Sequence, residues 1–447
     1  MPPVTGLDPR LAAYHLLREQ ERTGAFFKDL FPTGLALLRD DDAALARAIC
    51  FGVLRTRRLL DHNLDAHAPR GIKGGALRAL LRLGAYQILF LSGVPTFAAV
   101  NTTVELVKRE VGRPEAGFAN AVLKAVARDG LREPQGNDFK SLAIRHSHPD
   151  WLVRRWGRAL KPLALEAALR RNNEEAPLWV RANPRRGAAA CLPARLADDD
   201  VTLEAHPETP LFFRVVEGAG RALRSATFRD GSFSFQDPVS FWVGSLLAWR
   251  PGLSLLDACA APGGKSALVL EQALWRGEDA GAARIVCGDA SPTRLRRLED
   301  ARARLGHSGL MPVCQDVAHP AFRPASFDRV LVDAPCSNLG VLRRRPEARW
   351  SASQEKIVEI AARQRALLDG AAALVKPGGR LVYATCSAEG EETVEVVRGF
   401  LAAHPEFKRA PVDGAVPAAL CREGSLHVWP GETEYDGFFA AALVRVG

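Results

Sequence analysis

The stretch that decides the fold of this chain reads Leu255-Leu256-Asp257-Ala258-Cys259-Ala260-Ala261-Pro262-Gly263-Gly264-Lys265-Ser266. An apolar run ends in an acid, passes through small residues and two glycines, and continues into a segment rich in alanine and leucine. This order predicts a strand, a tight loop and a helix, the unit that opens a doubly wound α/β sheet. The helix N-terminus offers free backbone N–H groups, and Gly263 and Gly264 lack the Cβ atoms that would keep a ligand away from the backbone.

Two common nucleotide-binding motifs do not fit this loop. A P-loop needs a glycine five positions before Gly264-Lys265-Ser266, and that position holds Cys259. The dinucleotide fingerprint G-x-G-x-x-G is absent, which argues against a dehydrogenase. Two interpretations of the loop remain. It binds a nucleoside that carries a carboxylate, such as S-adenosylmethionine, or it is an ordinary strand–helix turn without a ligand. The loop residues that we assign to this cofactor are Cys259, Ala260, Ala261, Pro262, Gly263, Gly264 and Lys265.

The composition is that of a globular protein with a basic surface. The chain has 447 residues, of which 47% are hydrophobic and 25% charged, so it is long enough for two or three domains with large cores. Lysine and arginine exceed the acids by 60 to 51, a net charge of +9. This balance favours an anionic partner such as nucleic acid, although a soluble enzyme can carry it without one.

The cysteines and the absence of targeting signals bear on the compartment. Eight cysteines are scattered without a C-x-x-C pair, so we expect neither a zinc cluster nor a disulfide framework, and we assign no metal. We find no basic and apolar leader at the N-terminus and no apolar run of membrane-spanning length. We therefore expect a cytoplasmic protein without a membrane partner.

The first 130 or so residues predict a helical bundle. Asp8-Pro9 is typical of a helix start, and Leu77, Leu80 and Leu81 begin one of several apolar faces at helical spacing. Arginines recur between the apolar positions. They indicate either solvated helix faces or a surface that follows a phosphate backbone. Those that we single out are Arg55, Arg57, Arg58, Arg78 and Arg82.

A polar linker near residues 131–149 leads into a mixed region. Residues 163–170 predict a helix, and residues 178–181 and 211–216 predict strands. Tryptophans such as Trp151 and Trp156 alternate here with arginines. These tryptophans either stack on the bases of single-stranded RNA or pack in a hydrophobic core, and the sequence leaves both interpretations open.

After Gln236 the pattern alternates between strands and helices. This alternation predicts a parallel α/β sheet, with helices between each of the first five strands and ligands at the strand carboxyl ends. The predicted strands are residues 253–258, 284–287, 312–315, 329–332, 380–384 and 440–446.

Acids and cysteines follow the predicted strands. Asp289 is placed to accept hydrogen bonds from ribose hydroxyls, and Asp316 to reach an adenine edge, although a single acid at such a position is more often a helix cap. Cys336 follows the fourth strand and Cys386 the fifth, so both thiols reach the same crevice. A nucleophilic thiol needs a partly open, electropositive site, to which Lys265 and the arginines after Cys336 contribute.

The chain resembles the Sun/Fmu family of RNA (cytosine-5)-methyltransferases, in particular its bacterial small-subunit ribosomal RNA type. The resemblance covers nearly the whole chain, and its motifs together are highly specific. They are Asp257–Lys265, Asp333-Ala334-Pro335-Cys336-Ser337, Ala384-Thr385-Cys386-Ser387, Val428-Trp429-Pro430, Asp436-Gly437-Phe438-Phe439, Ser147-His148-Pro149-Asp150-Trp151-Leu152 and Phe118-Ala119-Asn120-Ala121-Val122-Leu123-Lys124.

The resemblance implies three domains. It implies a NusB-like all-α RNA-binding bundle at residues 1–138 and a small α+β RNA-recognition subdomain at 139–235. A Rossmann-like S-adenosylmethionine-dependent methyltransferase domain follows at 236–447. The implied reaction is methylation of carbon 5 of a cytosine, most simply in 16S ribosomal RNA, through a covalent cysteine adduct.

The resemblance also implies roles for individual residues. Cys386 would be the nucleophile and Cys336 would assist product release. Asp333 would hold the base and also border the cofactor. The chain departs from the family at Asn338-Leu339, where Gly-Thr is common, and at Thr393, where asparagine is frequent.

Three alternatives stay open at this point. One alternative is another RNA such as tRNA, since the sequence does not identify the base. A DNA cytosine-5 methyltransferase would use the thiol of Cys336 instead, but the Thr385-Cys386-Ser387 motif and the helical N-terminus favour RNA. A non-catalytic RNA-binding assembly factor would have no need of two intact cysteines.

Overall fold

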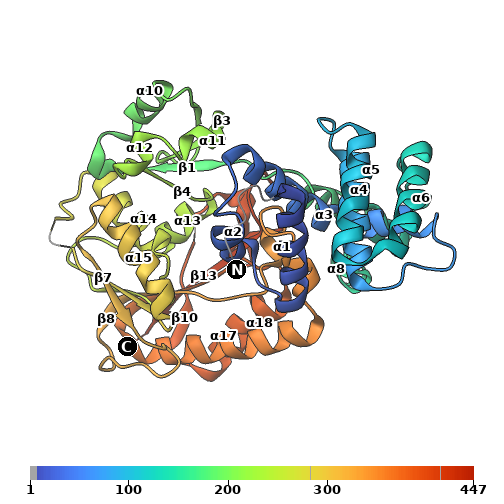
Figure 1. The fold of residues 1–447 in the computed structure, drawn as a ribbon. Helices are drawn as coiled ribbons and strands as arrows, with labels where there is room; N and C mark the ends of the chain where they lie inside the picture. The colour runs from blue at the N-terminus through green and yellow to red at the C-terminus, as the bar shows by residue number, and fades with distance from the viewer. Residues whose placement is uncertain (1–7, 282, 413, 447) are drawn as a thin grey trace. The chain divides into compact units, whose positions relative to one another are not determined.

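The computed structural model describes residues 8–281, 283–412 and 414–446, which form two compact units. Unit 1 comprises the described residues up to Glu175 together with the later segment Leu342–Ala352. Unit 2 comprises Ala176–Val341 and the described residues from Ser353 onward. Figure 1 shows the helices of unit 1 in blue to green, and the sheets of unit 2 in green to red.

The described residues of unit 1 form helices and connecting loops, as predicted for the first 130 or so residues, and helix α7 lies within the stretch 131–149 that was expected to be a linker. The first helix begins at Pro9 because the side chain of Asp8 accepts a hydrogen bond from the N–H of Arg10 at 2.8 Å, and it ends at Gly24 in a left-handed conformation. The helices are α1 (Pro9–Thr23), α2 (Phe27–Gly34), α3 (Asp40–Asp65), α4 (Gly75–Phe90), α5 (Thr96–Glu110), α6 (Arg113–Asp129), α7 (Phe139–Arg145), α8 (Asp150–Ala159), α9 (Pro162–Arg171) and α16 (Ala348–Ser351).

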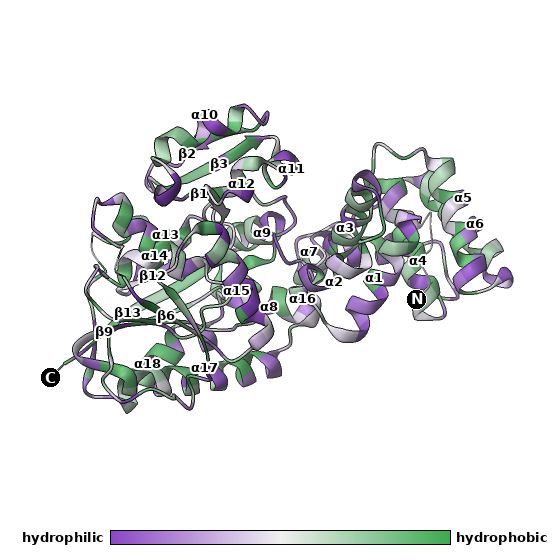
Figure 2. Ribbon diagram, turned by 60° about the vertical axis from the view of Figure 1, so that its left-hand side comes forward, coloured by the Kyte–Doolittle hydropathy of each residue, from purple (hydrophilic) through white to green (hydrophobic). Residues whose placement is uncertain are grey.

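One apolar core joins helices α1 to α6. Leu60, Leu80 and Leu123 are fully buried in it, and they come from α3, α4 and α6. Hydrophobic and hydrophilic residues alternate around α5 and α6 in Figure 2, as expected for helices with one face in a core. Trp156 on α8 is 1% exposed, so it is a core residue and not a stacking platform for RNA.

The segment Leu342–Ala352 is an integral part of unit 1, although about 165 residues separate it from the rest of that unit along the chain. Arg349 is fully buried and donates hydrogen bonds to the carbonyl oxygens of Ser147 and Asn172 and to Oδ1 of Asn173, at 2.7 to 3.1 Å. The indole N–H of Trp350 donates to the carbonyl oxygen of Leu54 at 3.0 Å. These contacts make the segment a structural element of the helical unit.

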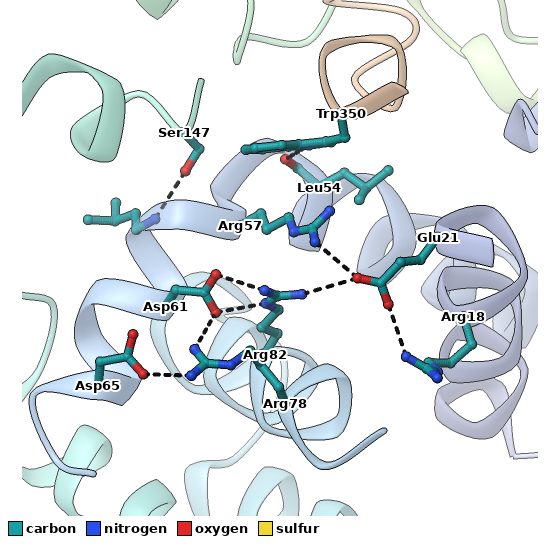
Figure 3. Close-up of polar contacts among 11 residues, drawn as sticks. Arg18, Glu21, Leu54, Arg57, Asp61, Asp65, Arg78, Arg82, Ser147 and Trp350 are labelled. Carbon is teal, nitrogen blue, oxygen red and sulfur yellow. Dashed lines mark hydrogen bonds and ion pairs between the residues drawn. The ribbon is translucent and has the colours of Figure 1, made fainter. Parts of the chain in front are cut away.

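The arginines of unit 1 are held by acids and carbonyl groups. Asp61 accepts hydrogen bonds from Arg78 at 3.2 Å and from Arg82 at 2.8 Å, while Glu21 accepts from Arg57 at 3.0 Å (Figure 3). The guanidinium of Arg57 also lies over the ring of Trp350. The remaining two arginines that the sequence singles out are bound likewise, Arg58 to Asp150 and Arg55 to the carbonyl oxygen of Arg343. These five arginines therefore do not form a free basic strip.

Unit 2 contains a small antiparallel sheet with strand order β2-β3-β1-β4. The strands are β1 (Trp179–Ala182), β2 (Thr202–Ala205), β3 (Phe212–Glu217) and β4 (Phe233–Phe235). Three short helices pack with this sheet: α10 (Leu192–Ala197), α11 (Ala219–Ala222) and α12 (Ala226–Arg229). Val180, Phe213 and Phe233 form its core, which confirms the small α+β region predicted for this part of the chain.

The large sheet of unit 2 has the order β11-β12-β13-β9-β8-β5-β6-β7, with β10 beside β13. Strands β5 to β9 are parallel neighbours, as predicted. The strands are β5 (Leu255–Asp257), β6 (Ile285–Asp289), β7 (Leu310–Cys314), β8 (Phe327–Asp333), β9 (Val375–Thr385), β10 (Phe407–Arg409), β11 (Cys421–Arg422), β12 (Ser425–Val428) and β13 (Phe438–Arg445).

Two details of the predicted sheet are wrong. The last predicted strand is β13, which pairs antiparallel with β9, so the sheet is mixed and not wholly parallel. The described residues 315–326, between β7 and β8, contain no helix, although one was expected there. The chain crosses between these strands through turns, whose polar and proline-containing sequence the alternation argument overlooked.

Two sets of helices cover opposite faces of this sheet. Along β8, Leu331 packs with α13 (Val239–Leu246), α14 (Gly264–Trp275) and α15 (Pro292–Leu305), whereas Val330 and Val332 pack with α17 (Gln354–Leu374) and α18 (Val394–Ala403). In Figure 1, α14 and α15 lie on one side and α17 and α18 on the other. The alternation follows from the two-residue repeat of a strand. Among the described helices, none combines the length and the apolar character needed to cross a membrane.

Candidate active site

The glycine loop joins β5 to α14 as the sequence predicts. Gly263 adopts a φ of 95°, where a side chain would be strained, and it caps the N-terminus of α14. The N–H of Ala261 donates to Oδ2 of Asp289 at 3.3 Å, which ties the loop to the end of β6. The loop alanines, Ala260 and Ala261, are buried, and Pro262 is exposed.

Two acids on adjacent strands lie beneath this loop. Asp257 is buried and accepts a hydrogen bond from Oγ of Ser266 at 2.6 Å, and burial raises its pKa to about 7. Asp333, at the end of β8, pairs with Nζ of Lys265 at 2.6 Å. Burial opposes the charge of Lys265, but the attraction of Asp333 prevails and its pKa lies above the ordinary value.

Two buried polar side chains lie at the ends of β6 and β7. Asp289 is 4% exposed, accepts the N–H of Ser291 at 2.9 Å and pairs with Arg294 at 3.4 Å. Gln315 is buried, and neither end of its side-chain amide has a hydrogen-bond partner. A Cβ on Gly288 would lie 2.8 Å from that amide, so the glycine keeps space open beside it. A buried acid and an unpartnered amide next to a glycine loop fit a nucleoside.

Two polar residues follow β7, and the one that is buried is not the one that the sequence singles out. Asp316 is exposed, and its carboxylate accepts the N–H of Ala318 at 3.0 Å in a local turn. Gln315, one residue earlier, is the polar side chain that is buried. The sequence points to Asp316 because it follows the predicted third strand, and burial, which distinguishes Gln315 from it, depends on the packing around both residues.

The two predicted thiols meet. Cys336 follows β8 and Cys386 follows β9, neighbouring parallel strands, and their Sγ atoms lie 2.9 Å apart. Both side chains are partly exposed, and the hydrogen bond with Cys386 lowers the pKa of Cys336. By contrast Cys259, the cysteine of the glycine loop, packs against the apolar core, and burial raises its pKa. Of these three thiols, the pair at the strand tips has the environment that a nucleophilic thiol needs, and the loop cysteine does not.

The loops that carry the thiols are joined through the backbone. The N–H of Gly340 donates to the carbonyl oxygen of Cys386 at 3.1 Å, and the N–H of Gly437 donates to that of Gly340 at 2.8 Å. A Cβ on Gly340 would lie 2.3 Å from the carbonyl oxygen of Gly437, so only glycine permits this approach. The motif around Gly437 thus belongs to the same site.

Sequence models of three families match the chain. The model for 16S rRNA methyltransferase RsmB/F matches residues 245–444, and that for the NusB family matches residues 8–128. The model for the ferredoxin-like domain of RsmF/B-like methyltransferases matches residues 148–218. These matches confirm the predicted fold class of a NusB-like bundle, a small α+β domain and an S-adenosylmethionine-dependent methyltransferase domain.

Relatives of known name match over nearly the full length. Ribosomal RNA small subunit methyltransferase B of Vibrio cholerae is 32% identical over 98% of both chains. A probable methyltransferase of the same name from Synechocystis is 30% identical over 98% of this chain and all of its own.

Solved structures agree on the fold. The crystal structure of PH0851 superposes with a TM-score of 0.80 over 99% of both chains, at 25% identity. The structure of NSun6 from Pyrococcus horikoshii with SFG has a TM-score of 0.57 at 18% identity, covers 67% of this chain and 98% of its own, and supports the fold alone. By its sequence and its fold, the chain belongs to the RsmB/F family of S-adenosylmethionine-dependent small-subunit ribosomal RNA methyltransferases.

Proposed function

We propose that this protein transfers a methyl group from S-adenosylmethionine to carbon 5 of a cytosine in 16S ribosomal RNA. The observation that carries the proposal is the pair of thiols at the tips of β8 and β9, 2.9 Å apart. The names of the full-length relatives support ribosomal RNA of the small subunit as substrate. The NusB match supports RNA binding by the N-terminal domain.

We keep the division into domains at residues 1–138, 139–235 and 236–447 as part of the proposal, together with a cytoplasmic location. All eight cysteines are free thiols, which accords with a reducing compartment. We assign no metal to the reaction, because a thiolate and an activated methyl donor suffice for its chemistry.

The proposed cofactor site is at the carboxyl ends of β5, β6 and β7. S-adenosylmethionine, when bound, supplies the electrophilic methyl group. Asp289 is placed to accept hydrogen bonds from the ribose hydroxyls, and the amide of Gln315 to meet the base of the nucleoside. We retain the loop from Cys259 to Lys265 and the acids Asp316 and Asp333 as assigned from the sequence.

Carbon 5 of cytosine is a poor nucleophile, and the proposed role of Cys386 is to activate it. Its thiolate adds to carbon 6 and forms a C–S bond, which moves an electron pair onto carbon 5. Carbon 5 then takes the methyl group with that electron pair, the bond from the methyl carbon to the sulfonium sulfur breaks, and the cofactor product leaves as the neutral thioether S-adenosylhomocysteine. Loss of the proton from carbon 5 returns the electron pair to the ring, the C–S bond breaks, and the thiolate is regenerated.

The neighbours of Cys386 assist these steps. We assign product release to Cys336, whose thiol lies in contact with the sulfur that must depart. Asp333 is assigned to hold the amino edge of the base, and the ion pair with Lys265 fixes its carboxylate. Because the site lies at the strand ends, the target base must leave any stack to reach it.

Methyl transfer from labelled cofactor to 16S ribosomal RNA, followed by bisulfite mapping, tests the proposal. We expect Cys386→Ala to abolish methylation and Cys336→Ala to trap a covalent enzyme–RNA complex. Persistent methylation in Cys386→Ala together with its loss in Cys336→Ala would instead support the mechanism of DNA cytosine-5 methyltransferases. Transfer to tRNA but not to 16S RNA would replace the proposed substrate, and inactivity of the wild type on every RNA would leave a binding role.

A further inference from the structure

Glu392 is a fully buried acid that touches both cysteine-bearing loops. Its Oε1 accepts the backbone N–H of Ser337 at 2.8 Å, and its Oε2 accepts hydrogen bonds from Oγ of Ser337 and Oγ of Ser387, each at 2.5 Å. Ser337 directly follows Cys336, and Ser387 directly follows Cys386. One carboxylate therefore binds the residue next to each thiol.

Two further hydrogen bonds hold Glu392, one at its carboxylate and one at its backbone carbonyl group. Nε2 of Gln364, on α17, donates to Oε1 at 3.2 Å and also to the carbonyl oxygen of Pro335 at 2.9 Å. The hydroxyl of Tyr383, on β9, donates to the backbone carbonyl oxygen of Glu392 at 2.6 Å. A buried carboxylate is costly unless its acceptor sites are filled, so this arrangement has one stable geometry.

The hydrogen bonds of Glu392 affect the distance between the two thiol sulfur atoms. Strands β8 and β9 are in parallel register, with Asp333 opposite Ala384, but both chains leave the sheet before they reach the cysteines. Beyond the strand ends, the sheet hydrogen bonds no longer fix the loops. Besides the backbone hydrogen bond from Gly340 to Cys386, the carboxylate of Glu392 joins the two loops at Ser337 and Ser387.

We propose that Glu392 is a positioning residue for the two-thiol site, because it holds Ser337 and Ser387 and thereby sets the contact between Cys336 and Cys386. This inference rests on the proposed function, in which one thiol adds to the base and the other assists its release. Glu392 does not reach the thiols itself and acts through the two serines.

The negative charge of Glu392 also influences the thiol of Cys336. Although the hydrogen bond with Cys386 lowers the pKa of Cys336, the negative charge of Glu392 opposes that shift. The carboxylate therefore acts on Cys336 through its charge as well as through the serines, although the net shift of the Cys336 pKa is downward.

The substitution Glu392→Gln tests whether the site needs a carboxylate at this position or only a buried polar side chain. Glutamine has nearly the same size, but its amide nitrogen donates and cannot accept, so it cannot receive all three hydrogen bonds from Ser337 and Ser387. Glu391→Gln is the matched control, because Glu391 is the adjacent acid, is partly exposed and is outside the proposed site.

The first experiment measures steady-state methyl transfer and the rate of adduct formation on RNA that carries 5-fluorocytosine, whose fluorine cannot leave as a proton does. For Glu392→Gln we expect kcat and the adduct rate to fall about 100-fold, since an error of about 1 Å has such an effect. The KM values for cofactor and RNA should stay within about twofold, as should every value for Glu391→Gln. An unchanged kcat, or a loss that appears only in KM, would overturn the inference.

A double-mutant cycle guards against misfolding of the glutamine variant. Ser387→Ala removes one of the donors to Oε2 and leaves the carboxylate in place, and we expect it to lower kcat by about tenfold while the protein still unfolds in one cooperative transition at a slightly lower melting temperature. Combined with Glu392→Gln it should add little further loss, because both changes remove the same contact. Full additivity of the two losses would contradict the inference. Absence of cytosine methylation in the wild type would instead disprove the proposed function.

Discussion

Asn338 adopts a left-handed backbone conformation, with a φ of 62°, directly beside the thiols. Asparagine tolerates this region better than other residues with a side chain, which explains how the chain departs from the Gly-Thr-Gly that is common in the family at this point. Its Nδ2 donates to the carbonyl oxygen of Cys336 at 2.9 Å, and its Oδ1 lies 3.6 Å from Sγ of Cys386. The departure therefore preserves the backbone and adds polar contacts.

A prediction follows for this position. Asn338→Gly should keep the loop conformation, whereas Asn338→Ala should be less stable than the glycine variant by about 1 kcal/mol, because alanine pays the left-handed penalty without a compensating hydrogen bond. Denaturant unfolding of the two variants measures the difference. Equal stability would mean that the loop does not need a positive φ here.

Asp257 should make stability depend on pH. Its pKa is about 7 in the folded protein against an ordinary 3.8, so between about pH 4 and pH 7 the folded state holds a proton that the unfolded state has lost. The free energy of unfolding should accordingly fall as pH rises through that interval, by an amount on the order of 4 kcal/mol from this group.

Asp257→Asn should lack this contribution. As pH rises from 4 to 7.5, the wild type should lose stability relative to the variant. The other carboxylates affect both proteins alike, so the difference in unfolding free energy reports on Asp257. Denaturant melts across this range measure it. A difference that is independent of pH would show that Asp257 titrates normally.

At the scale of elements, a buried ion pair connects the small sheet to the cofactor loop. Arg181 on β1 pairs with Glu271 on α14 at 2.5 Å, and His307 contacts the same carboxylate at 2.8 Å, with all three side chains at most 1% exposed. Arg181 also donates to the carbonyl oxygen of Gly264 at 2.7 Å and contacts Gln236. The small sheet thus supports the loop that we assign to the cofactor.

Loss of this arginine should have two separable effects. Arg181→Met should destabilise the protein by about 3–5 kcal/mol, because it leaves Glu271 buried without its cation, and it should weaken cofactor binding. The double variant Arg181→Met/Glu271→Met should regain most of the stability but not the affinity, since Gly264 stays unsupported. Thermal unfolding and calorimetric titration with S-adenosylmethionine test this. Recovery of both properties together would contradict a role of Arg181 at the loop.

At the scale of the whole molecule, the chain enters the helical unit twice. It leaves unit 2 after Val341, only five residues beyond Cys336, contributes Leu342–Ala352 to unit 1 and returns at Ser353. Phe27 on α2 donates its N–H to Glu347 of this segment at 3.1 Å, and Arg55 on α3 donates to the carbonyl oxygen of Arg343 at 2.9 Å. The stability of unit 1 therefore depends on residues far along the chain.

Arg349→Ala tests that dependence. It leaves two buried carbonyl oxygens and the partly buried Oδ1 of Asn173 without their donor, so we expect a loss of about 3 kcal/mol in the stability of unit 1. Hydrogen exchange should show the loss in α3 and α8, while amides of β5, β8 and β9 keep their protection. Lost protection that is confined to unit 2 would contradict the assignment of this segment to unit 1.

The sequence by itself determined the elements and the chemistry at their ends. The apolar strand before the glycine loop, the helical spacing of unit 1 and the residue types at the strand tips are local patterns. Backbone preferences and hydrophobic periodicity fix such patterns within about ten residues. The residues that the sequence placed at successive strand ends, among them Asp289, Cys336 and Cys386, do lie at one edge of the sheet.

Only the tertiary structure decided which partners those residues have. The sequence does not reveal that Glu392 spans both cysteine loops, that Gln315 and not Asp316 is buried, or that Arg349 belongs to the helical unit. It also did not show that β13 runs antiparallel to β9. Each of these depends on contacts between residues distant in the chain, and burial, which decides whether a polar group needs a partner, is a property of the packed whole.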